Sequence, residues 1–408
     1  MNKYENGSAM TTLSVVIPAY NEEDGIAEIA HRVLAVRDDL AKVGIDDLEL
    51  IVVDDGSKDH TVEIARSIEG VRLIQHPQNR GYGAALKTGF SHARGELIGF
   101  LDADGTYPPE YFPKLCELAL NGTDLVVGSR MAGSESQMPL TRRIGNIFFA
   151  TLLSIVGRCR ITDSASGMRV FKREVLERIY PLPDGLNLTP VMSTRAVHER
   201  IKMAEVPIPY SERVGRSKLS IVHDGSVFLQ SMIWTVLTYN PVRILGLIGV
   251  AGVALAALIF VGLVIARLSG ITQLGAWGVA AVFTAMVSSI TGISLFALGV
   301  TFNYTVSIFH KQPVRQGLFG KPVFKKPLNH HFGWIGLLGL VAGLVSGAVS
   351  LGLGISGWPI ERLWLYLLGS AMLILAGVQL MIYWVLLRVL EELGQREVMA
   401  QKDMMGFA

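Results

Sequence analysis

Four long apolar stretches in the second half of the chain restrict its possible folds more than any other feature. They predict helices at about residues 242–267, 276–308, 332–356 and 363–388. Each exceeds the roughly 20 residues that a helix needs to cross the hydrocarbon core of a bilayer. Charged residues are common up to about Lys218 and sparse beyond it. We therefore expect an integral membrane protein, with a soluble domain at residues 1–220 and four transmembrane helices within residues 242–392.

Basic residues between these stretches indicate their orientation. Five basic residues and no acidic ones separate the second stretch from the third: Lys311, Arg315, Lys321, Lys325 and Lys326. The other two connections carry no basic residue. Because Lys and Arg accumulate in cytoplasmic loops, we expect the soluble domain, this loop and a tail at residues 393–408 to face the cytoplasm at the plasma membrane. Residues 1–10 are polar, so no signal peptide is expected.

The net charge of +2 says little about partners. No nucleic-acid partner is expected, whereas the basic loop suits the anionic headgroups of a bilayer.

The N-terminal part of the chain alternates between short apolar runs and segments of helical periodicity. Strands are predicted at residues 13–17, 49–53, 71–75, 97–101 and 124–130, and helices at 24–40, up to Ile68 and from Ala84. Polar residues gather where the strands end. This order predicts an α/β domain with a largely parallel open sheet, whose ligand cleft lies at the carboxyl ends of the strands.

Two carboxylates one residue apart follow the fourth predicted strand. Asp102 and Asp104 would project from its carboxyl end into that cleft. Two hard oxygen donors can hold Mg²⁺ or Mn²⁺ that takes further ligands from a diphosphate. The alternative is a solvated turn, because Asp and Gly favour turns.

Gly81-Tyr82-Gly83 precedes another predicted helix, where glycines can cradle a phosphate. The spacing matches neither GxGxxG nor GxxxxGK[ST]. A tight turn is therefore the favoured interpretation.

Four motifs together resemble the family 2 glycosyltransferases of the GT-A fold. They are residues 18–22 (PAYNE), 53–57 (VDDGS), 79–81 (NRG) and 102–104 (DAD), in this order. More narrowly they are similar to the polyprenyl-phosphate sugar transferases, which include dolichyl-phosphate mannose synthases and undecaprenyl-phosphate glucosyl transferases. The resemblance covers about residues 11–220, and some members of the family carry two or four C-terminal spans.

The resemblance implies roles for individual residues. It implies that one set of residues holds the nucleotide: Pro18, Tyr20, Glu22, Val53 and Asp55. Asp102, Ala103 and Asp104 match the metal and diphosphate site. Arg130 and Arg169 match arginines near the phosphates, and Arg213 and Lys218 match a basic pair at the donor and acceptor phosphates. Thr106 stands where some relatives have a Gln that binds the metal, and Arg216 could exchange roles with Arg213.

The implied reaction is metal-dependent transfer of a sugar from a nucleotide-diphosphate sugar, GDP-mannose or a UDP-sugar, to dolichyl or undecaprenyl phosphate. An acceptor phosphate is ionised near neutral pH, so it needs no general base. The protein must instead supply charge compensation and alignment. Direct attack on the anomeric carbon predicts inversion.

Residues 221–241 predict an amphipathic helix at the membrane interface. Its apolar residues fall mostly on one side, Trp234 and Tyr239 suit the interface, and Asn240-Pro241 breaks into the first span. A core helix of the soluble domain is the alternative.

Glycines recur along the third apolar stretch: Gly333, Gly336, Gly339, Gly343 and Gly347. Small residues let helices approach closely. This spacing favours helix packing over a lipid groove.

Rival functions remain open. A processive polysaccharide synthase should carry Gln-x-x-Arg-Trp on the interface helix, whereas residues 230–234 read Gln-Ser-Met-Ile-Trp. A lipid-carrier transporter or a non-catalytic scaffold is the other alternative. The absence of charges within the central parts of the spans disfavours an ion-coupled path, and the intact Asp102 and Asp104 disfavour a scaffold.

Overall fold

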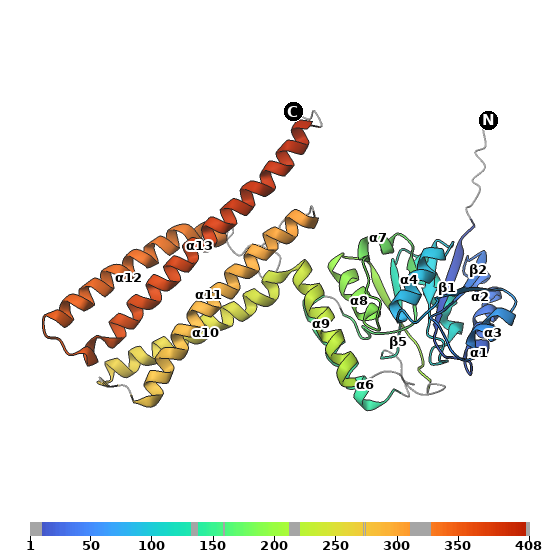
Figure 1. Ribbon diagram of the computed structural model, residues 1–408, viewed down its shortest axis with the longest axis horizontal. Coiled ribbons are helices and arrows are strands. Elements are labelled where there is room, and N and C mark those ends of the chain that lie inside the picture. The colour runs from blue at the N-terminus through green and yellow to red at the C-terminus, as the bar shows by residue number, and fades with distance from the viewer. Residues whose placement is uncertain are drawn as a thin grey trace. The chain divides into compact units, whose positions relative to one another are not determined.

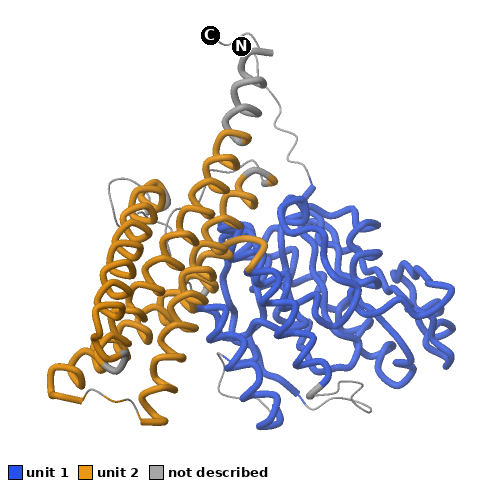
Figure 2. The backbone as a smooth tube through the Cα atoms, turned by 60° about the vertical axis from the view of Figure 1, so that its left-hand side comes forward, with its two compact units in different colours: residues 1–236 blue, residues 237–408 orange. Residues whose placement is uncertain are grey.

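The computed structural model describes residues 10–131, 138–157, 160–211, 221–271, 273, 275–310 and 328–404. The chain divides into two compact units, residues 1–236 and 237–408 (Figure 2). The predicted strands and helices of the first unit and the four predicted apolar helices of the second are all present as such elements.

One mixed sheet organises the described part of the first unit (Figure 1). Its seven strands are β1 (Thr12–Ala19), β2 (Asp47–Asp54), β3 (Val71–Gln75), β4 (Leu97–Phe100), β5 (Leu125–Ser129), β6 (Arg169–Lys172) and β7 (Met203–Pro207). Their spatial order is β3-β2-β1-β4-β6-β5-β7. All neighbours are parallel except β6, which runs antiparallel to β4 and β5. The expectation of a largely parallel open sheet is confirmed.

Helices cover both faces of this sheet, so its central strands bury side chains on both sides. The elements between the strands are α1 (Ile26–Ala35), α2 (Arg37–Lys42), α3 (Thr61–Ser67), α4 (Tyr82–His92), the 3₁₀ turn η1 (Pro109–Tyr111), α5 (Phe112–Leu120), α6 (Leu140–Gly157), α7 (Val175–Ile179) and α8 (Leu188–His198). In β1, Leu13, Val15 and Ile17 join the core beneath α1 and α5, whereas Val16 joins the core beneath α4, α7 and α8. This alternation follows from the two-residue period of a strand.

Three details differ from the sequence-based expectations. The helix expected at residues 24–40 is two helices, α1 and α2, which meet at Val36. Strands β6 and β7 were not predicted, because β6 begins and ends with a charged residue and β7 contains Glu205 and ends with Pro207, so neither is an apolar run. Helix α9 (Ile221–Tyr239) ends two residues before the end predicted for the interface helix, and most of it belongs to the first compact unit.

The second unit consists of two helical hairpins. Helices α10 (Pro241–Leu268) and α11 (Ala276–His310) form one, and α12 (Phe332–Ile355) and α13 (Ile360–Met404) form the other, with the 3₁₀ turn η2 (Leu328–His331) before α12. Four helices among the described residues are long and apolar enough to cross a membrane. The protein is therefore a membrane protein. Helix α13 continues through much of the region that was expected to be a separate tail.

Glycines bring the helices of each hairpin together. A Cβ atom on Gly249 of α10 would lie 2.6 Å from the carbonyl oxygen of Gly292 in α11. In the second hairpin, a Cβ on Gly336 would lie 2.8 Å from the carbonyl oxygen of Gly377. Ser370 donates a hydrogen bond of 2.8 Å to the carbonyl of Gly343. The interpretation of the α12 glycines as packing residues is confirmed.

Candidate active site

A cavity of about 450 Å³ opens at the carboxyl ends of β1, β2, β4 and β5. Most of the residues predicted for substrate or metal binding line it: Pro18, Tyr20, Glu22, Asp55, Asp102, Ala103, Asp104 and Arg130. They converge because neighbouring parallel strands end at the same edge of the sheet. Arg213, Arg216 and Lys218 lie outside the residues that the structure describes.

The two carboxylates at the centre of the cavity are held by neighbouring hydroxyl groups. Tyr82 donates a hydrogen bond of 2.8 Å to Oδ1 of Asp102. Burial, together with the negative charge of Asp102, raises the pKa of Tyr82 well above its usual value, so this phenol remains a donor. The Thr106 hydroxyl donates to Oδ1 of Asp104 over 2.6 Å. Thr106 thus supports an acidic residue directly, whatever its relation to a metal.

The donor set of this pair fits a divalent cation that shares its ligands with a substrate. Both side chains line the cavity, and carboxylate oxygen is the donor that Mg²⁺ and Mn²⁺ prefer. No cluster of three or more His, Cys, Asp or Glu side chains suited to a metal occurs in the described ranges. A cation held here would therefore take its remaining ligands from substrate phosphate and water, as Mg²⁺ commonly does.

Gly167 leaves the space that the Asp102 carboxylate occupies. A Cβ atom at residue 167 would lie 2.4 Å from Oδ2 of Asp102 and 2.7 Å from its Oδ1. The Gly167 amide donates to the Tyr107 hydroxyl over 2.7 Å, which fixes the approach of this backbone. Only a residue without a side chain fits beside the acidic pair in this arrangement.

The loop at residues 79–81 is folded around the carboxylate of Asp55. Oδ1 of Asp55 accepts the amide of Arg80 over 2.9 Å, and Oδ2 accepts the amide of Gly81 over 2.8 Å. Gly81 has a positive φ of 103°, and a Cβ on it would lie 2.5 Å from the carbonyl oxygen of Asp184. The amide of Gly81, the residue just before α4, is therefore committed to a protein carboxylate, which supports a tight turn over a phosphate cradle.

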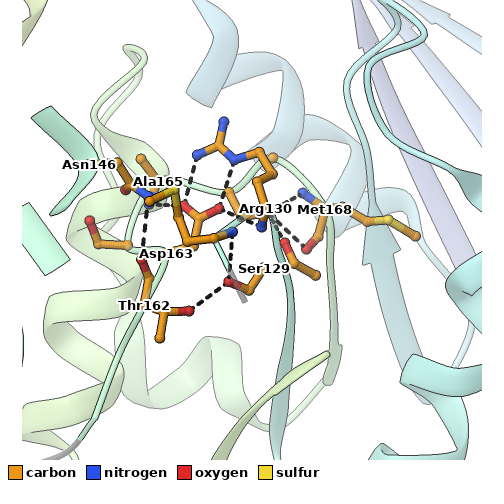
Figure 3. Close-up of polar contacts among 12 residues, drawn as sticks. Ser129, Arg130, Asn146, Thr162, Asp163, Ala165 and Met168 are labelled. Atoms are coloured by element: carbon orange, nitrogen blue, oxygen red, sulfur yellow. Dashed lines mark hydrogen bonds and ion pairs between the residues drawn. The ribbon is translucent and has the colours of Figure 1, made fainter. Parts of the chain in front are cut away.

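Arg130 reaches the cavity as half of a buried ion pair (Figure 3). Its Nε and Nη2 donate to the two oxygens of Asp163 over 2.7 and 2.8 Å. The guanidinium also lies over the rings of Tyr107 and Tyr210, 5.8 and 5.4 Å from their centroids. Burial disfavours its charge, but the attraction of Asp163 outweighs this and raises the pKa of Arg130 well above its usual value. The arginine is fixed and charged, and a neighbouring carboxylate offsets its charge.

Two predicted contacts are not made at the cavity wall. Val53 is fully buried in the core beneath α4, so its side chain does not reach a nucleotide. Arg169 is also fully buried and donates to the carbonyls of Ser164, Ser166 and Thr189. Burial lowers the pKa of Arg169 to about 10, so it remains cationic at neutral pH. Arg169 is not among the residues that line the cavity, so its expected place near the substrate phosphates stays a prediction.

The position of Arg169 gives it a supporting task instead. Two of the carbonyls that it binds lie on the segment between Asp163, which pairs with Arg130, and Gly167, which contacts Asp102. The third lies on α8. It therefore holds together two walls of the cavity. Its short strand, β6, carried no signal in the sequence from which this inward direction could be read.

Several cavity residues were missed by sequence reasoning. Tyr82 was considered only as part of a glycine turn and Phe228 only as part of the interface helix, whereas Leu186 was given no role and Arg142 was not considered. Arg142 lies in the first turn of α6, a helix that the strand pattern did not reveal. These residues extend the cavity from the acidic pair toward α6 and α9.

Helices α6 and α9 both expose apolar side chains near this end of the cavity. On α6 the exposed residues are Leu140, Ile144, Ile147 and Phe148, and on α9 they are Ile233 and Trp234. The α6 positions recur at intervals of three or four residues, which places them in one stripe. The opposite sides of the helices pack together, with the rings of Phe149 and Phe228 6.2 Å apart.

Comparisons with known proteins match both parts of the chain. The family model for glycosyl transferase family 2 matches residues 14–180, and a model described as a domain of unknown function matches residues 241–401. A dolichyl-phosphate hexose transferase from Haloferax volcanii is 36% identical over 222 residues, which cover 54% of this chain and 92% of that protein. An undecaprenyl-phosphate 4-deoxy-4-formamido-L-arabinose transferase from Aeromonas hydrophila is 30% identical over 310 residues, 73% of this chain and 90% of that protein.

Similarity to solved structures is weaker. Glucosyl-3-phosphoglycerate synthase from Mycobacterium tuberculosis, in complex with Mn²⁺, uridine diphosphate and glucosyl-3-phosphoglycerate, is 24% identical, with a TM-score of 0.44 over 56% of this chain and 80% of that one. The first family model includes the cavity residues from Pro18 to Gly167.

Proposed function

Because the chain belongs to glycosyl transferase family 2 and is a membrane-bound glycosyltransferase of the GT-A fold, we propose that it transfers a sugar from a nucleotide-diphosphate sugar to a polyprenyl phosphate, with inversion at the anomeric carbon. One observation carries this proposal: the Asp102 and Asp104 carboxylates line a single cavity together with two other groups of residues. These are the residues at the ends of β1 and β2 that are expected to bind the nucleotide, and the arginines of β5 and α6. Relatives named for transfer to polyprenyl phosphates support the acceptor class.

The two ends of the cavity would divide the substrates between them. Pro18, Tyr20 and Asp55 would hold the nucleoside, as the family resemblance implies, and the acidic pair would hold Mg²⁺ or Mn²⁺. When bound, such a cation supplies positive charge for the leaving diphosphate. Ala103 lies between the two acids and would leave space for the diphosphate. GDP-mannose and UDP-sugars are the donors considered.

Arg130 and Arg142 would bind the acceptor phosphate, because a planar guanidinium pairs well with phosphate oxygens. An ionised phosphate oxygen attacks the anomeric carbon, the bond from that carbon to the diphosphate oxygen breaks, and the nucleoside diphosphate leaves with the electron pair. No protein base is needed because the nucleophile is already an anion. Arg213 and Lys218 are proposed as further phosphate ligands on the resemblance alone.

The exposed apolar stripes of α6 and α9 support a position at the bilayer surface. Amphipathic helices with Trp, Phe and Leu on one face bind in the headgroup region. Leu186 and Phe228 give this end of the cavity an apolar lining that suits the first part of a polyprenyl chain. The basic residues between α11 and α12 support a cytoplasmic site at the plasma membrane.

The processive synthase remains the second candidate, and the test must separate the two. The full-length protein in liposomes is incubated with labelled nucleotide sugars and with undecaprenyl or dolichyl phosphate, and the lipid phase is extracted. The proposal predicts label in a lipid-linked monosaccharide, and NMR of the product should give the anomeric configuration opposite to that of the donor. Label found only in long polymer would favour the synthase, and no transfer from any donor would contradict the proposal.

A further inference from the structure

A buried histidine that the proposed reaction does not use contacts the carboxylate of Asp55. The ring of His76, just after β3, donates from Nδ1 to Oδ1 of Asp55 over 2.7 Å, and its Nε2 lies 2.9 Å from the Thr88 hydroxyl on α4. Both side chains of the His76 and Asp55 pair are only 4% exposed. The His76 amide donates to the carbonyl of Asp54, which also fixes the backbone that carries the side chain.

The chemistry of the partners determines which nitrogen carries the hydrogen. An ionised carboxylate can only accept, so Nδ1 must donate to Asp55. Nε2 is then free to accept from the Thr88 hydroxyl, which can rotate to donate. His76 thus links the ends of β2 and β3 to the middle of α4, and its ring has no freedom to turn without losing both bonds.

These contacts leave Asp55 with a limited capacity for a ligand. Each carboxylate oxygen offers about two acceptor positions. Oδ1 accepts from His76 and from the Arg80 amide, so it is filled, whereas Oδ2 accepts only from the Gly81 amide among the residues that the structure describes. Asp55 lines the cavity. One acceptor position on Oδ2 therefore remains for a donor group in the cavity.

We propose that His76 is a positioning residue that fixes Asp55 with this one acceptor position turned to the cavity, so that the site selects nucleobases whose pairing edge presents a ring N–H. Uracil and guanine carry a ring N–H on that edge. Cytosine and adenine carry a ring nitrogen acceptor there, whose lone pair would oppose the carboxylate. This inference rests on the proposed function, because it assumes that the cavity binds a nucleoside diphosphate.

Two substitutions separate the hydrogen bond from the bulk of the ring. His76→Leu removes the donor, so the Asp55 carboxylate can rotate. The open acceptor position is then no longer held toward the cavity. His76→Asn keeps an N–H donor close to the position of Nδ1. Inorganic pyrophosphate lacks a base, so its binding reports on the acidic pair and on correct folding, and it should not respond to either change.

The test measures the binding of UDP, GDP, CDP, ADP and inorganic pyrophosphate, each with Mn²⁺, to the full-length protein in lipid nanodiscs by equilibrium dialysis. We expect UDP or GDP to bind about tenfold or more tightly than both CDP and ADP, as loss of one hydrogen bond to a charged group predicts. His76→Leu should reduce this preference to about threefold or less with pyrophosphate affinity unchanged, and His76→Asn should retain it.

The inference would be overturned by a wild-type protein that binds the four nucleotides equally, or by a His76→Leu variant that keeps the preference. It would also be overturned by a His76→Leu variant that loses as much affinity for pyrophosphate as for UDP or GDP. A His76→Asn variant as unselective as His76→Leu would overturn it as well, because ring size would then matter more than the N–H. Failure of the wild-type protein to bind any of the five probes would instead contradict the proposed function itself.

Discussion

A single added methyl group at Gly167 should disable the acidic pair while the rest of the fold stays intact. The Cβ of Gly167→Ala would lie 2.4 Å from Oδ2 of Asp102, about 1 Å inside the 3.4 Å at which ordinary contacts begin. The carboxylate cannot turn aside without cost, since Tyr82 holds its other oxygen at 2.8 Å. The loop cannot retreat freely either, because the Gly167 amide is bound to Tyr107.

Overpacking of this kind typically costs about 1–3 kcal/mol. If Asp102 moves, that cost appears as about 5- to 150-fold weaker binding of a nucleoside diphosphate with Mn²⁺. If the loop moves instead, the same cost appears in the thermal unfolding of the first unit. Both quantities should therefore be measured on the full-length protein, by calorimetric titration with UDP and GDP and by differential scanning.

Gly145→Ala is the matched control. A Cβ at Gly145 of α6 meets nothing within 4 Å, so this change should leave binding unaltered and stabilise the helix by about 0.5–1 kcal/mol. A Gly167→Ala protein that binds nucleotide and unfolds like Gly145→Ala would refute the reasoning, since the Asp102 carboxylate would then not depend on the space beside it.

Further perturbations test the supporting groups. Tyr82→Phe should weaken Mn²⁺-dependent nucleotide binding about tenfold, and equally from pH 6 to 9 because the pKa of the phenol lies well above its usual value; a pH-dependent loss would contradict this. Asp163→Asn should cost about 3–5 kcal/mol of stability at pH 7 by leaving Arg130 unpaired. Burial disfavours the ionised form of Asp163, but Arg130 outweighs burial and lowers the pKa of Asp163. The stabilisation by the ion pair is therefore present above the unfolded-state pKa of about 3.9 and is lost as the pH falls through the lower folded-state pKa. The difference in unfolding temperature between the wild-type protein and Asp163→Asn should therefore shrink below about pH 4. Gly377→Val should lower the unfolding temperature of the helical unit, because its Cβ would lie 2.6 Å from the facing backbone, whereas Gly262→Val, with nothing within 4 Å, should not; equal effects would argue against close packing.

The sequence was sufficient for the elements with strong periodicity. The runs that form β1 to β5 are apolar because the sheet buries both faces, and the acids at their ends mark the cleft, so Asp55, Asp102 and Asp104 could be placed before any coordinates. Strands β6 and β7 escaped because charged residues interrupt or bound their few apolar positions, so neither gives the continuous apolar run that marked β4 and β5.

The partners of the arginines could not be predicted. Asp163 lies 33 residues from Arg130, and nothing in the sequence links the two before β5 and the segment ahead of β6 come together. Arg169 was expected near the phosphates from the family resemblance, yet its side chain binds three carbonyls in this structure. Charge type is visible in a sequence, whereas the direction of a side chain depends on tertiary packing.

The role proposed for the Asp102 and Asp104 pair is to enable sugar transfer to a lipid phosphate. It is tested most directly by lipid-phase label in liposomes that contain the wild-type protein, Asp104→Ala or Asp39→Ala. Asp39 is 60% exposed on α2 and forms an ion pair only with Lys42 within the described part of the chain, so it controls for loss of a carboxylate. We predict that Asp39→Ala matches the wild-type protein, that Asp104→Ala gives no label above background, and that chelation of divalent cations abolishes transfer by the wild-type protein. Undiminished transfer by Asp104→Ala would contradict the account.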